Sequence, residues 1–411
     1  MSSQPPGDKL ALPERPHLRH LKHQAADLLA AGRATSVADA QFQIARAYGF
    51  ASWPKLKAHV EATAEVAELK RAIDTNDLER VKALMTANPE LHEAPMGYAK
   101  DGPLTWVAEC RVPWEPPSDT RLTIAAWMLA HGSDVHRGGD APLMRAALNA
   151  DRTQMMVLLV AHGADVNAAW HRHFPIIFAA CETVDPVALG WLLDHGADPD
   201  CGGTRRWRSS SYSEPATALD CVIASYVREP ERLRACIDKL LDAGGHTSVA
   251  APGVMSILRG RIAELAELCA SDRSLVTRRF PELDFGVTGE RMLTLRGSTL
   301  LHVAAEYGAL DAATTLIDGG ADVNARATIG DAGVGGQTPI FHAATQRGEA
   351  GLAMVRLLIE RGADLSVRAK LPGHYEREDE VVECTPLGYA LRFPEGENRA
   401  VALLRERGAP P

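Results

Sequence analysis

The chain has 411 residues, more than one compact core accommodates, so the sequence predicts several domains or an extended array. Its net charge of −9 at pH 7 argues against a general affinity for nucleic acids or anionic membranes, which both require a positive surface. No apolar run reaches the roughly 20 residues that span a bilayer, and seven scattered cysteines without a CxxC pair favour free thiols in a reducing cytoplasm.

The N-terminal segment differs from the rest of the chain. Residues 1–15 lack the apolar core of a secretory signal, and we predict that they are disordered. We predict that residues 16–62 form a small helical head. Its first helical stripe consists of Leu18, Leu21, Ala25, Leu28 and Leu29. A second helix, capped near Ser36 and closed at Gly49, precedes a third that runs through Val60.

From residue 68 onward, one short phrase recurs along the chain. It is a glycine followed by a small residue and an aspartate, and it begins at Gly132, Gly163, Gly196, Gly320 and Gly362. The first spacings are 31 and 33 residues, and the later ones are longer, which indicates insertions. An apolar pair such as Leu159-Val160 precedes each glycine. We interpret the pair as the buried end of a helix and the glycine as the left-handed residue that closes it.

A second phrase opens the next unit, where residues 298–305, 338–344 and 385–390 read STLLHVAA, TPIFHAA and TPLGYA. Thr338 suits a helix N-cap, and Pro339 suits the first helical position. The two phrases together resemble the ankyrin family over roughly residues 68 to 411. The resemblance implies an all-α solenoid of eight or nine helix pairs, joined by hairpin or loop fingers.

The head resembles the short helical leader that precedes some bacterial ankyrin proteins, and residues 44–53 (IARAYGFASW) are its most telling stretch. Because the ends of a solenoid must cover an apolar face, we expect the head to cap the first repeat. A separate interaction role for the head is the alternative.

The array divides into two predicted blocks, residues 68–250 and 254–411. Residues 78–91 recur in pattern as residues 262–275, at an offset of 184. The intervening Ala251-Pro252-Gly253 predicts a bend or joint. One continuous solenoid is the alternative.

Five histidines are predicted to be structural. His131, His162 and His195 each precede a closing glycine. Equivalent residues of stacked repeats lie about 8–10 Å apart, too far for two ligands that each lie about 2 Å from one zinc ion. A helix C-terminus is itself a favourable place for a partly charged ring. His302 and His342 are assigned to the histidine position of the opening phrase, where the resemblance implies a structural hydrogen bond. We therefore predict no metal site and no cofactor.

Three fingers are enlarged by insertions: residues 201–215, 325–337 and 368–384. The first of these and the finger before it carry cationic and aromatic side chains on an acidic protein. The predicted partner-binding site consists of Trp170, His171, Arg172, His173, Arg205, Arg206, Trp207 and Tyr212. Arginine and tryptophan are enriched at binding hot spots. The alternative is a solvated loop in which Trp170 packs against a helix.

Two further segments are enlarged or strongly charged. The turn from Arg111 to Arg121 contains Pro113, Trp114, Pro116 and Pro117, and the repeat geometry places it on the edge opposite the fingers. The acidic run from Glu376 to Glu383 could bind a cation, but a solvated loop is the more common structure for such a run.

The sequence contains no His-Glu-x-x-His, no phosphate loop and no Gly-x-Ser-x-Gly. We therefore favour a cytoplasmic protein-recognition scaffold that binds a protein partner, of acidic or anionic character, through the ankyrin groove and enlarged fingers. An enzyme that uses the groove and long fingers as a small-molecule pocket is the runner-up. A nucleic-acid reader is third because of the net charge. Fold alone does not determine function, so the site must decide among these.

Overall fold

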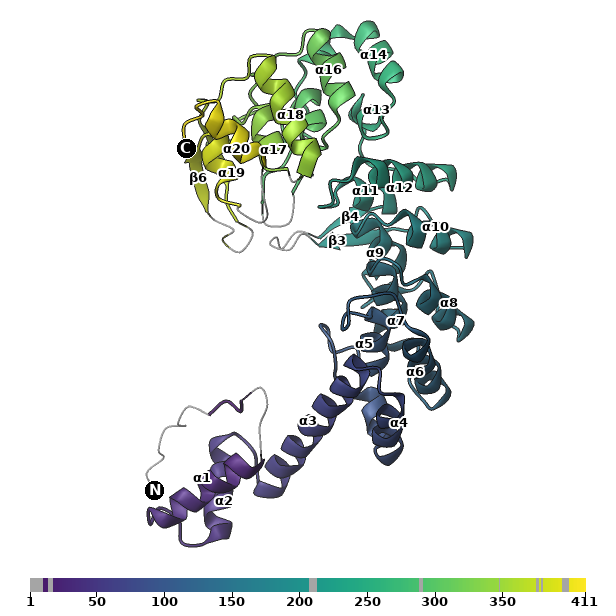
Figure 1. The fold of residues 1–411 in the computed structure, drawn as a ribbon, viewed down its shortest axis with the longest axis vertical. Coiled ribbons are helices and arrows are strands. Elements are labelled where there is room, and N and C mark those ends of the chain that lie inside the picture. The colour runs from purple at the N-terminus through teal and green to yellow at the C-terminus, as the bar shows by residue number, and fades with distance from the viewer. Residues whose placement is uncertain are drawn as a thin grey trace. The chain divides into compact units, whose positions relative to one another are not determined.

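The computed structural model describes residues 10–13, 18–206, 213–287, 291–346, 348–374, 377, 380–393 and 399–411 (Figure 1). By its internal contacts the chain divides into two compact units, Met1–Arg137 and Gly138–Pro411. The joint predicted at residues 251–253 therefore falls inside the second unit. All seven cysteines are free thiols. Within the described ranges, no helix is both long enough and apolar enough to cross a membrane.

Among the described residues of the first unit, all regular secondary structure is helical. Its helices are α1 (Leu18–Ala30), α2 (Val37–Ala47), α3 (Trp53–Asp74), α4 (Leu78–Ala87), the 3₁₀ helix η1 (Pro89–Glu93), α5 (Pro103–Glu109) and α6 (Asp119–Ala130).

Helices α1 and α2 pack with the first part of α3 and form a small core of their own. Its buried members are Leu21, Ala25, Ala40, Ile44, Ala45, Leu56 and Val60. Ser36 Oγ accepts a hydrogen bond from the Asp39 N–H at 3.1 Å, and Gly49 has a φ of 83°. Both predicted ends of α2 are therefore confirmed. Of the segment predicted to be disordered, only Leu10 to Pro13 is described, and the Leu10 N–H donates to the Ala47 carbonyl at 2.9 Å.

Helix α3 joins the head to the first repeat without a break. It has 22 residues; its first part lies in the head core, and its last part packs against α4. The predicted boundary at residue 62 therefore lies inside one helix. The head's apolar side chains pack among themselves, and this packing does not test whether the head covers the first repeat. Its role as a cap therefore stays a prediction.

The second unit continues the array of helix pairs. Its helices are α7 (Arg137–Leu148, which begins at the boundary), α8 (Thr153–Ala161), α9 (Ile176–Glu182), α10 (Pro186–Asp194), α11 (Ala218–Ile223), α12 (Pro230–Asp242), α13 (Val254–Leu258), α14 (Ile262–Ser271), the 3₁₀ helix η2 (Arg273–Val276), α15 (Leu300–Glu306), α16 (Leu310–Asp318), α17 (Pro339–Ala344), α18 (Gly348–Glu360), α19 (Pro386–Ala390) and α20 (Arg399–Glu406). In the described residues, α3 to α20 follow one another as nine pairs, in agreement with the eight or nine predicted repeats.

Strands in the described ranges form three antiparallel hairpins, each in a finger, as the sequence predicts. They are β1 (Ala169–Trp170) with β2 (Phe174–Pro175), β3 (Gly203–Arg206) with β4 (Ser213–Ala216), and β5 (Ala369–Pro372) with β6 (Val381–Cys384).

The closing phrase behaves as predicted. The φ values of Gly132, Gly163, Gly196, Gly320 and Gly362 are 112°, 100°, 88°, 98° and 91°. The first residue of each preceding apolar pair is at most 1% exposed, as at Leu159 and Leu316. Each glycine therefore closes a helix in the left-handed conformation that side chains disfavour.

An asparagine after the closing phrase links successive repeats. Asn167 Nδ2 donates to the Gly196 carbonyl at 2.9 Å, and Asn167 Oδ1 accepts from the Asp198 N–H at 2.8 Å. Asn324 makes the same pair of bonds to Gly362 and Asp364, at 3.0 and 2.7 Å. These asparagines therefore satisfy backbone groups of the next repeat.

Candidate functional site

The predicted site begins in the finger formed by β1 and β2. Trp170 is half-buried, with the Arg145 guanidinium 5.6 Å from its ring centre and the Phe174 ring edge-on at 6.1 Å. Arg145 belongs to α7, so Trp170 packs against a helix, as the alternative interpretation of this finger held. The tryptophan therefore anchors the finger, and its exposed part is small.

The tip of this finger is exposed and charged. His171, Arg172 and His173 are all exposed, and His171 and Arg172 have φ values of 47° and 68°. The His171 N–H donates to the Gly138 carbonyl at 2.8 Å. A Cβ at Gly139 would lie 2.3 Å from the Ala169 carbonyl oxygen, so only glycine allows this close approach. The backbone thus fixes the tip, and the His171 and His173 rings lie 4.7 and 5.9 Å from the Trp170 ring, measured between ring centres.

The next finger lies directly beside the first, as predicted. Strand β2 contacts β3, and a Cβ at Gly203 would lie 2.6 Å from Pro175 and 2.8 Å from Phe178. Arg205 and Arg206 lie on β3, paired with Glu214 and Ser213 of β4. Trp207 and Tyr212 lie outside the described residues. Adjacency of the two fingers is thus observed, and their use as a binding site stays a prediction.

The acidic run in the third enlarged finger is described at Glu380 and Glu383. Glu380 accepts hydrogen bonds from Arg377 and Arg392, and Glu383 accepts one from Arg368 at 3.3 Å. Glu376, Glu378 and Asp379 lie outside the described residues. The described carboxylates are thus held by arginines. In the part of the chain that the structure describes, no group of three His, Cys, Asp or Glu side chains is arranged to hold a metal ion.

The histidines at the helix ends bond to their own helices. His131, His162 and His195 each place Nδ1 2.7–2.8 Å from the carbonyl oxygen four residues earlier. A carbonyl only accepts, so each ring donates to one of the last carbonyls of its helix. His195 also stacks on Trp191, with ring centres 3.8 Å apart. These contacts confirm the predicted structural role.

His302 and His342 differ from each other, and the shared assignment was wrong for His342. His302 lies three residues after Thr299, and its Nδ1 accepts from the Thr299 N–H at 3.2 Å. His342 lies four residues after Thr338, at the position of Val303, and Phe341 takes the histidine position. One extra residue turns the His342 ring by about 100° around the helix, away from its own N-cap. It contacts Glu306 instead.

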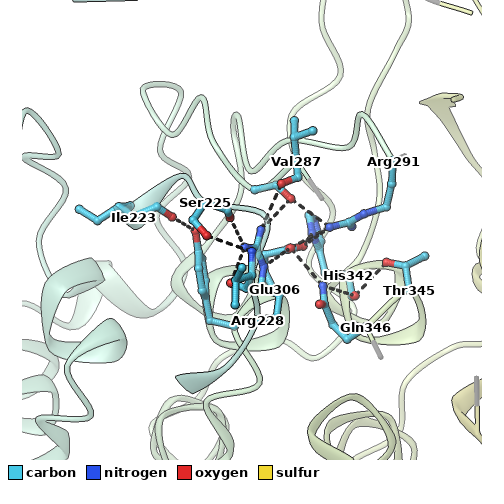
Figure 2. Close-up of polar contacts among 12 residues, drawn as sticks. Ile223, Ser225, Arg228, Val287, Arg291, Glu306, His342, Thr345 and Gln346 are labelled. Atoms are coloured by element: carbon cyan, nitrogen blue, oxygen red, sulfur yellow. Dashed lines mark hydrogen bonds and ion pairs between the residues drawn. The ribbon is translucent and has the colours of Figure 1, made fainter. Parts of the chain in front are cut away.

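Glu306 is the centre of a buried charge cluster (Figure 2). Its Oε1 accepts from Arg228 Nε at 2.9 Å, from Arg291 Nη2 at 2.7 Å and from Gln346 Nε2 at 3.0 Å. Its Oε2 accepts from Arg291 Nη2 at 2.8 Å and from His342 Nδ1 at 2.7 Å. The carboxylate therefore has a full set of donors, as a buried charge requires.

The cluster also shifts the pKa values of its members. Burial alone would raise the pKa of Glu306, but Arg291, Arg228 and the hydrogen bond from His342 hold it well below its usual range. Burial lowers the pKa of His342 in spite of the adjacent carboxylate. Glu306 is thus ionised and His342 neutral. Both side chains have no exposed surface, so this acid–base pair does not contact solvent.

The finger that covers this cluster consists of residues 277–287 and 291–298 and was not predicted from the sequence. It carries Arg291 and five buried apolar side chains: Phe280, Leu283, Phe285, Leu293 and Leu295. The Leu295 N–H donates to the Phe285 carbonyl at 2.7 Å. Leu283 and Phe285, like Leu293 and Leu295, are separated by one residue, the spacing of a one-sided extended segment. That spacing could have predicted the finger.

Comparison with known proteins agrees with this architecture. A model of three ankyrin repeats matches residues 282–369 and 301–411, and a model of the single ankyrin repeat matches residues 138–170. The crystal structure of the human ASB11 ankyrin repeat domain is 23% identical and is similar over 66% of this chain and 99% of that chain, with a TM-score of 0.30. No curated protein matches the sequence. The helix pairs, the closing glycines and the matched repeats together show a mostly helical ankyrin-repeat domain with a few short hairpin strands.

Proposed function

We propose that the chain is a protein-recognition scaffold, and that the two adjacent fingers, residues 169–175 and 203–216, hold its partner-binding site. The observation that carries this proposal is the exposed cationic tip His171–His173, held by the backbone beside the finger that carries Arg205 and Arg206. Because the backbone of this tip is already fixed, binding costs little backbone conformational entropy. Free thiols throughout the chain suit action in a reducing cytoplasm.

The proposed partner is a protein with an acidic surface at the contact. Positive charge is concentrated on these fingers, while the chain as a whole carries a net charge of −9. Such an arrangement steers an anionic partner to one place, because the remaining surface repels it. Guanidinium groups can also bind carboxylates through paired hydrogen bonds.

The proposal is tested with the double variant Arg205→Ala/Arg206→Ala of the full chain. The partner is first captured from native extract, and its association is then measured at two ionic strengths. We expect slower association and a weaker dependence on salt, since long-range attraction between charges is screened by ions. The variant Trp207→Ala should instead speed dissociation, because it removes contact area.

The matched control removes two arginines from another part of the second unit, Arg296→Ala/Arg361→Ala. Arg296 and Arg361 have side chains 66% and 34% exposed and pair with Asp284 and Asp318. The net charge changes equally, so the control separates a local site from a general effect of charge. Wild-type affinity of the Arg205→Ala/Arg206→Ala variant at both ionic strengths would eliminate this site.

A further inference from the structure

Three arginines occupy equivalent places near the start of the three later fingers of the second unit. Each arginine is exposed, whereas the residue that follows it is buried and apolar. The three pairs are Arg279-Phe280, Arg326-Ala327 and Arg368-Ala369. We call Arg279, Arg326 and Arg368 the arginine row. The apolar residue enters the core of the repeat, so the arginine beside it is left on the outer surface.

Hydrogen bonds to the backbone hold the arginine row in series. Arg279 Nε donates to the Arg326 carbonyl at 2.7 Å, and Arg326 Nη2 donates to the Arg368 carbonyl at 2.5 Å. Arg368 Nη2 donates to the Glu383 carbonyl at 3.3 Å. Two of the side chains thus reach the following finger, and the third is held within its own. The whole row lies in the second unit.

These bonds leave most of the charge of the row uncompensated. A carbonyl oxygen accepts a hydrogen bond but carries no full charge. Among the described residues, Arg279 and Arg326 form no ion pair. Arg368 pairs with Glu383 at 3.3 Å, but the two side chains are 57% and 51% exposed, and water weakens such a pair. A carboxylate from a ligand can therefore take the place of Glu383 at little cost.

A second carboxylate, Asp364, restricts the kind of anion that fits. Hydrogen bonds from Ser366 and, to a smaller extent, the charge of Arg326 lower the pKa of Asp364, so this group is ionised near the row. A nucleic-acid duplex carries one charge for about every 1.7 Å of its axis, and would bring many phosphates close to Asp364 and Glu383. A ligand with few and widely spaced carboxylates avoids this repulsion.

The repeat spacing also restricts the conformation of the ligand. Packed helices of neighbouring repeats lie about 8–10 Å apart. A polyproline II segment rises about 3.1 Å per residue with three residues per turn, so every third side chain lies on one side at intervals of about 9 Å. In a β-strand the third side chain faces the opposite side. The row therefore matches polyproline II better than a strand.

We propose that the arginine row binds an extended acidic peptide whose carboxylates recur at every third residue. Guanidinium groups bind carboxylates through charge-assisted hydrogen bonds, and a preformed polyproline II segment loses little entropy on binding. The row shares no residue with the fingers of residues 169–175 and 203–216. The proposal thus goes beyond the proposed function, because it adds a second site and states the conformation and spacing of its ligand.

The test measures binding of synthetic peptides to the full chain by fluorescence anisotropy at low ionic strength, where charges are screened least. The probe is a labelled peptide of three Glu-Pro-Pro units. The matched peptide has the same composition, with its three glutamates consecutive. We expect the spaced peptide to bind at least tenfold more tightly than the matched peptide. Equal affinities, or no binding of the spaced peptide, would overturn the proposal.

Variants of the chain show whether the arginine row carries the binding. Arg326→Gln/Arg368→Gln should weaken binding of the spaced peptide at least tenfold. Arg356→Gln/Arg407→Gln is the matched control, since it removes the same charge from two exposed positions of the second unit outside the row. Equal weakening by the two variants would reduce the effect to general attraction and would overturn the proposal. Circular dichroism checks that each variant is folded.

A second measurement locates the peptide without any variant. Phenylglyoxal labelling of Arg279 and Arg326, quantified by mass spectrometry, should fall at least threefold when wild type is saturated with the spaced peptide. Labelling of Arg356 should not change. Unchanged labelling of the row would contradict the proposal even if a variant failed to fold.

The same probe separates this site from the finger site and from a nucleic-acid site. Loss of peptide binding in Arg205→Ala/Arg206→Ala, with normal binding in Arg326→Gln/Arg368→Gln, would assign the peptide to the fingers and overturn the proposal. Tighter binding of a short oligothymidylate that displaces the peptide would assign the row to nucleic acid, with the same consequence. The peptide assay does not use the captured partner, so failure of the finger site leaves its result valid.

Discussion

In the second unit, the β1–β2 finger has an exposed tip, whereas the later fingers are hydrogen-bonded to one another. In the earlier half, the β1–β2 finger is a three-residue turn between two-residue strands, and its tip His171–His173 is exposed. In the later half, three fingers are connected in series. Thr328 N–H donates to the Gly297 carbonyl at 2.9 Å, and Gly335 N–H donates to the Lys370 carbonyl at 2.7 Å.

The difference lies in what the inserted residues contain. The finger of residues 277–287 and 291–298 buries five apolar side chains and Arg291, so it covers α15 and becomes part of the core. The earlier finger buries part of Trp170 and leaves its cations in water. An inserted finger can therefore close over the array or project from it, according to its apolar content. Removal of a residue should affect stability in the first case and binding in the second.

The largest effect is expected for Glu306→Ala. The change leaves Arg228 and Arg291 buried without their carboxylate, and breaking a buried ion pair in this way costs about 3–5 kcal/mol. This loss should appear when unfolding in urea is monitored by hydrogen exchange of the residues that cover α15. A local readout is needed because a long repeat array need not unfold in one step.

The control for this variant is Glu349→Ala. Glu349 pairs with Arg399, but their side chains are 74% and 60% exposed, and exposed pairs contribute about 0–1 kcal/mol. Equal destabilisation by the two variants would show that the cluster does not hold the later fingers.

The next largest expected effect is a dependence of folding stability on pH in the later half of the second unit. Burial lowers the pKa of His302 from 6.5 to about 3, so the folded chain binds fewer protons than the unfolded chain at a pH below 6.5. Stability is therefore lost as the pH falls. Between pH 7 and pH 5 the loss from His302 alone should be about 2 kcal/mol. Glu306 contributes little in this window, because a carboxyl with an ordinary pKa of 4.5 is also largely ionised there.

The measurement is urea unfolding at pH 7, 6 and 5 for wild type and His302→Gln. The variant should lose part of the pH dependence, because it cannot titrate. His23→Gln, which replaces an exposed histidine of α1, is the control. An unchanged slope in His302→Gln would contradict a buried neutral imidazole.

A smaller effect is expected from a closing glycine. At Gly196, φ is +88° and a Cβ would meet nothing within 4 Å, so Gly196→Ala tests backbone strain without a clash. The left-handed conformation should cost about 1–2 kcal/mol. Gly202→Ala is the matched control in the adjacent finger, since its Cβ would also meet open space and its φ is not in the left-handed region. Similar melting temperatures for both variants would contradict the role of the closing turn.

The repeated frame could be predicted because it depends on local rules. A glycine such as Gly163 is required by a left-handed turn whatever surrounds it, and an apolar pair such as Leu159-Val160 follows helical geometry. The position of the β1–β2 finger beside the β3–β4 finger followed from the same repeat spacing.

The parts that failed depend on distant partners. His342 resembles His302 in its phrase, but one extra residue turns it toward Glu306, 36 positions away. Arg228 and Glu306 are 78 positions apart, so no local pattern predicts their contact. The continuity of α3 across the predicted boundary near residue 62 was not predicted for a different reason. Residues 61–68 of α3 are exposed or half-buried, so they lack the apolar stripe that predicts a helix, and only the cores at each end reveal its continuity.

The smallest effect on stability is expected at the tip of the earlier finger. Arg172 is exposed, and both arginine and alanine would occupy its left-handed conformation at a similar backbone cost. Arg172→Ala should therefore change the free energy of unfolding by no more than about 0.5 kcal/mol, as is usual for exposed positions. The same change removes a cation from the proposed site, so association with the captured partner should slow, and Arg172→Lys should largely preserve it at low salt. A stability loss above about 1 kcal/mol would place this finger with the later ones, as a covering element whose residues serve the core.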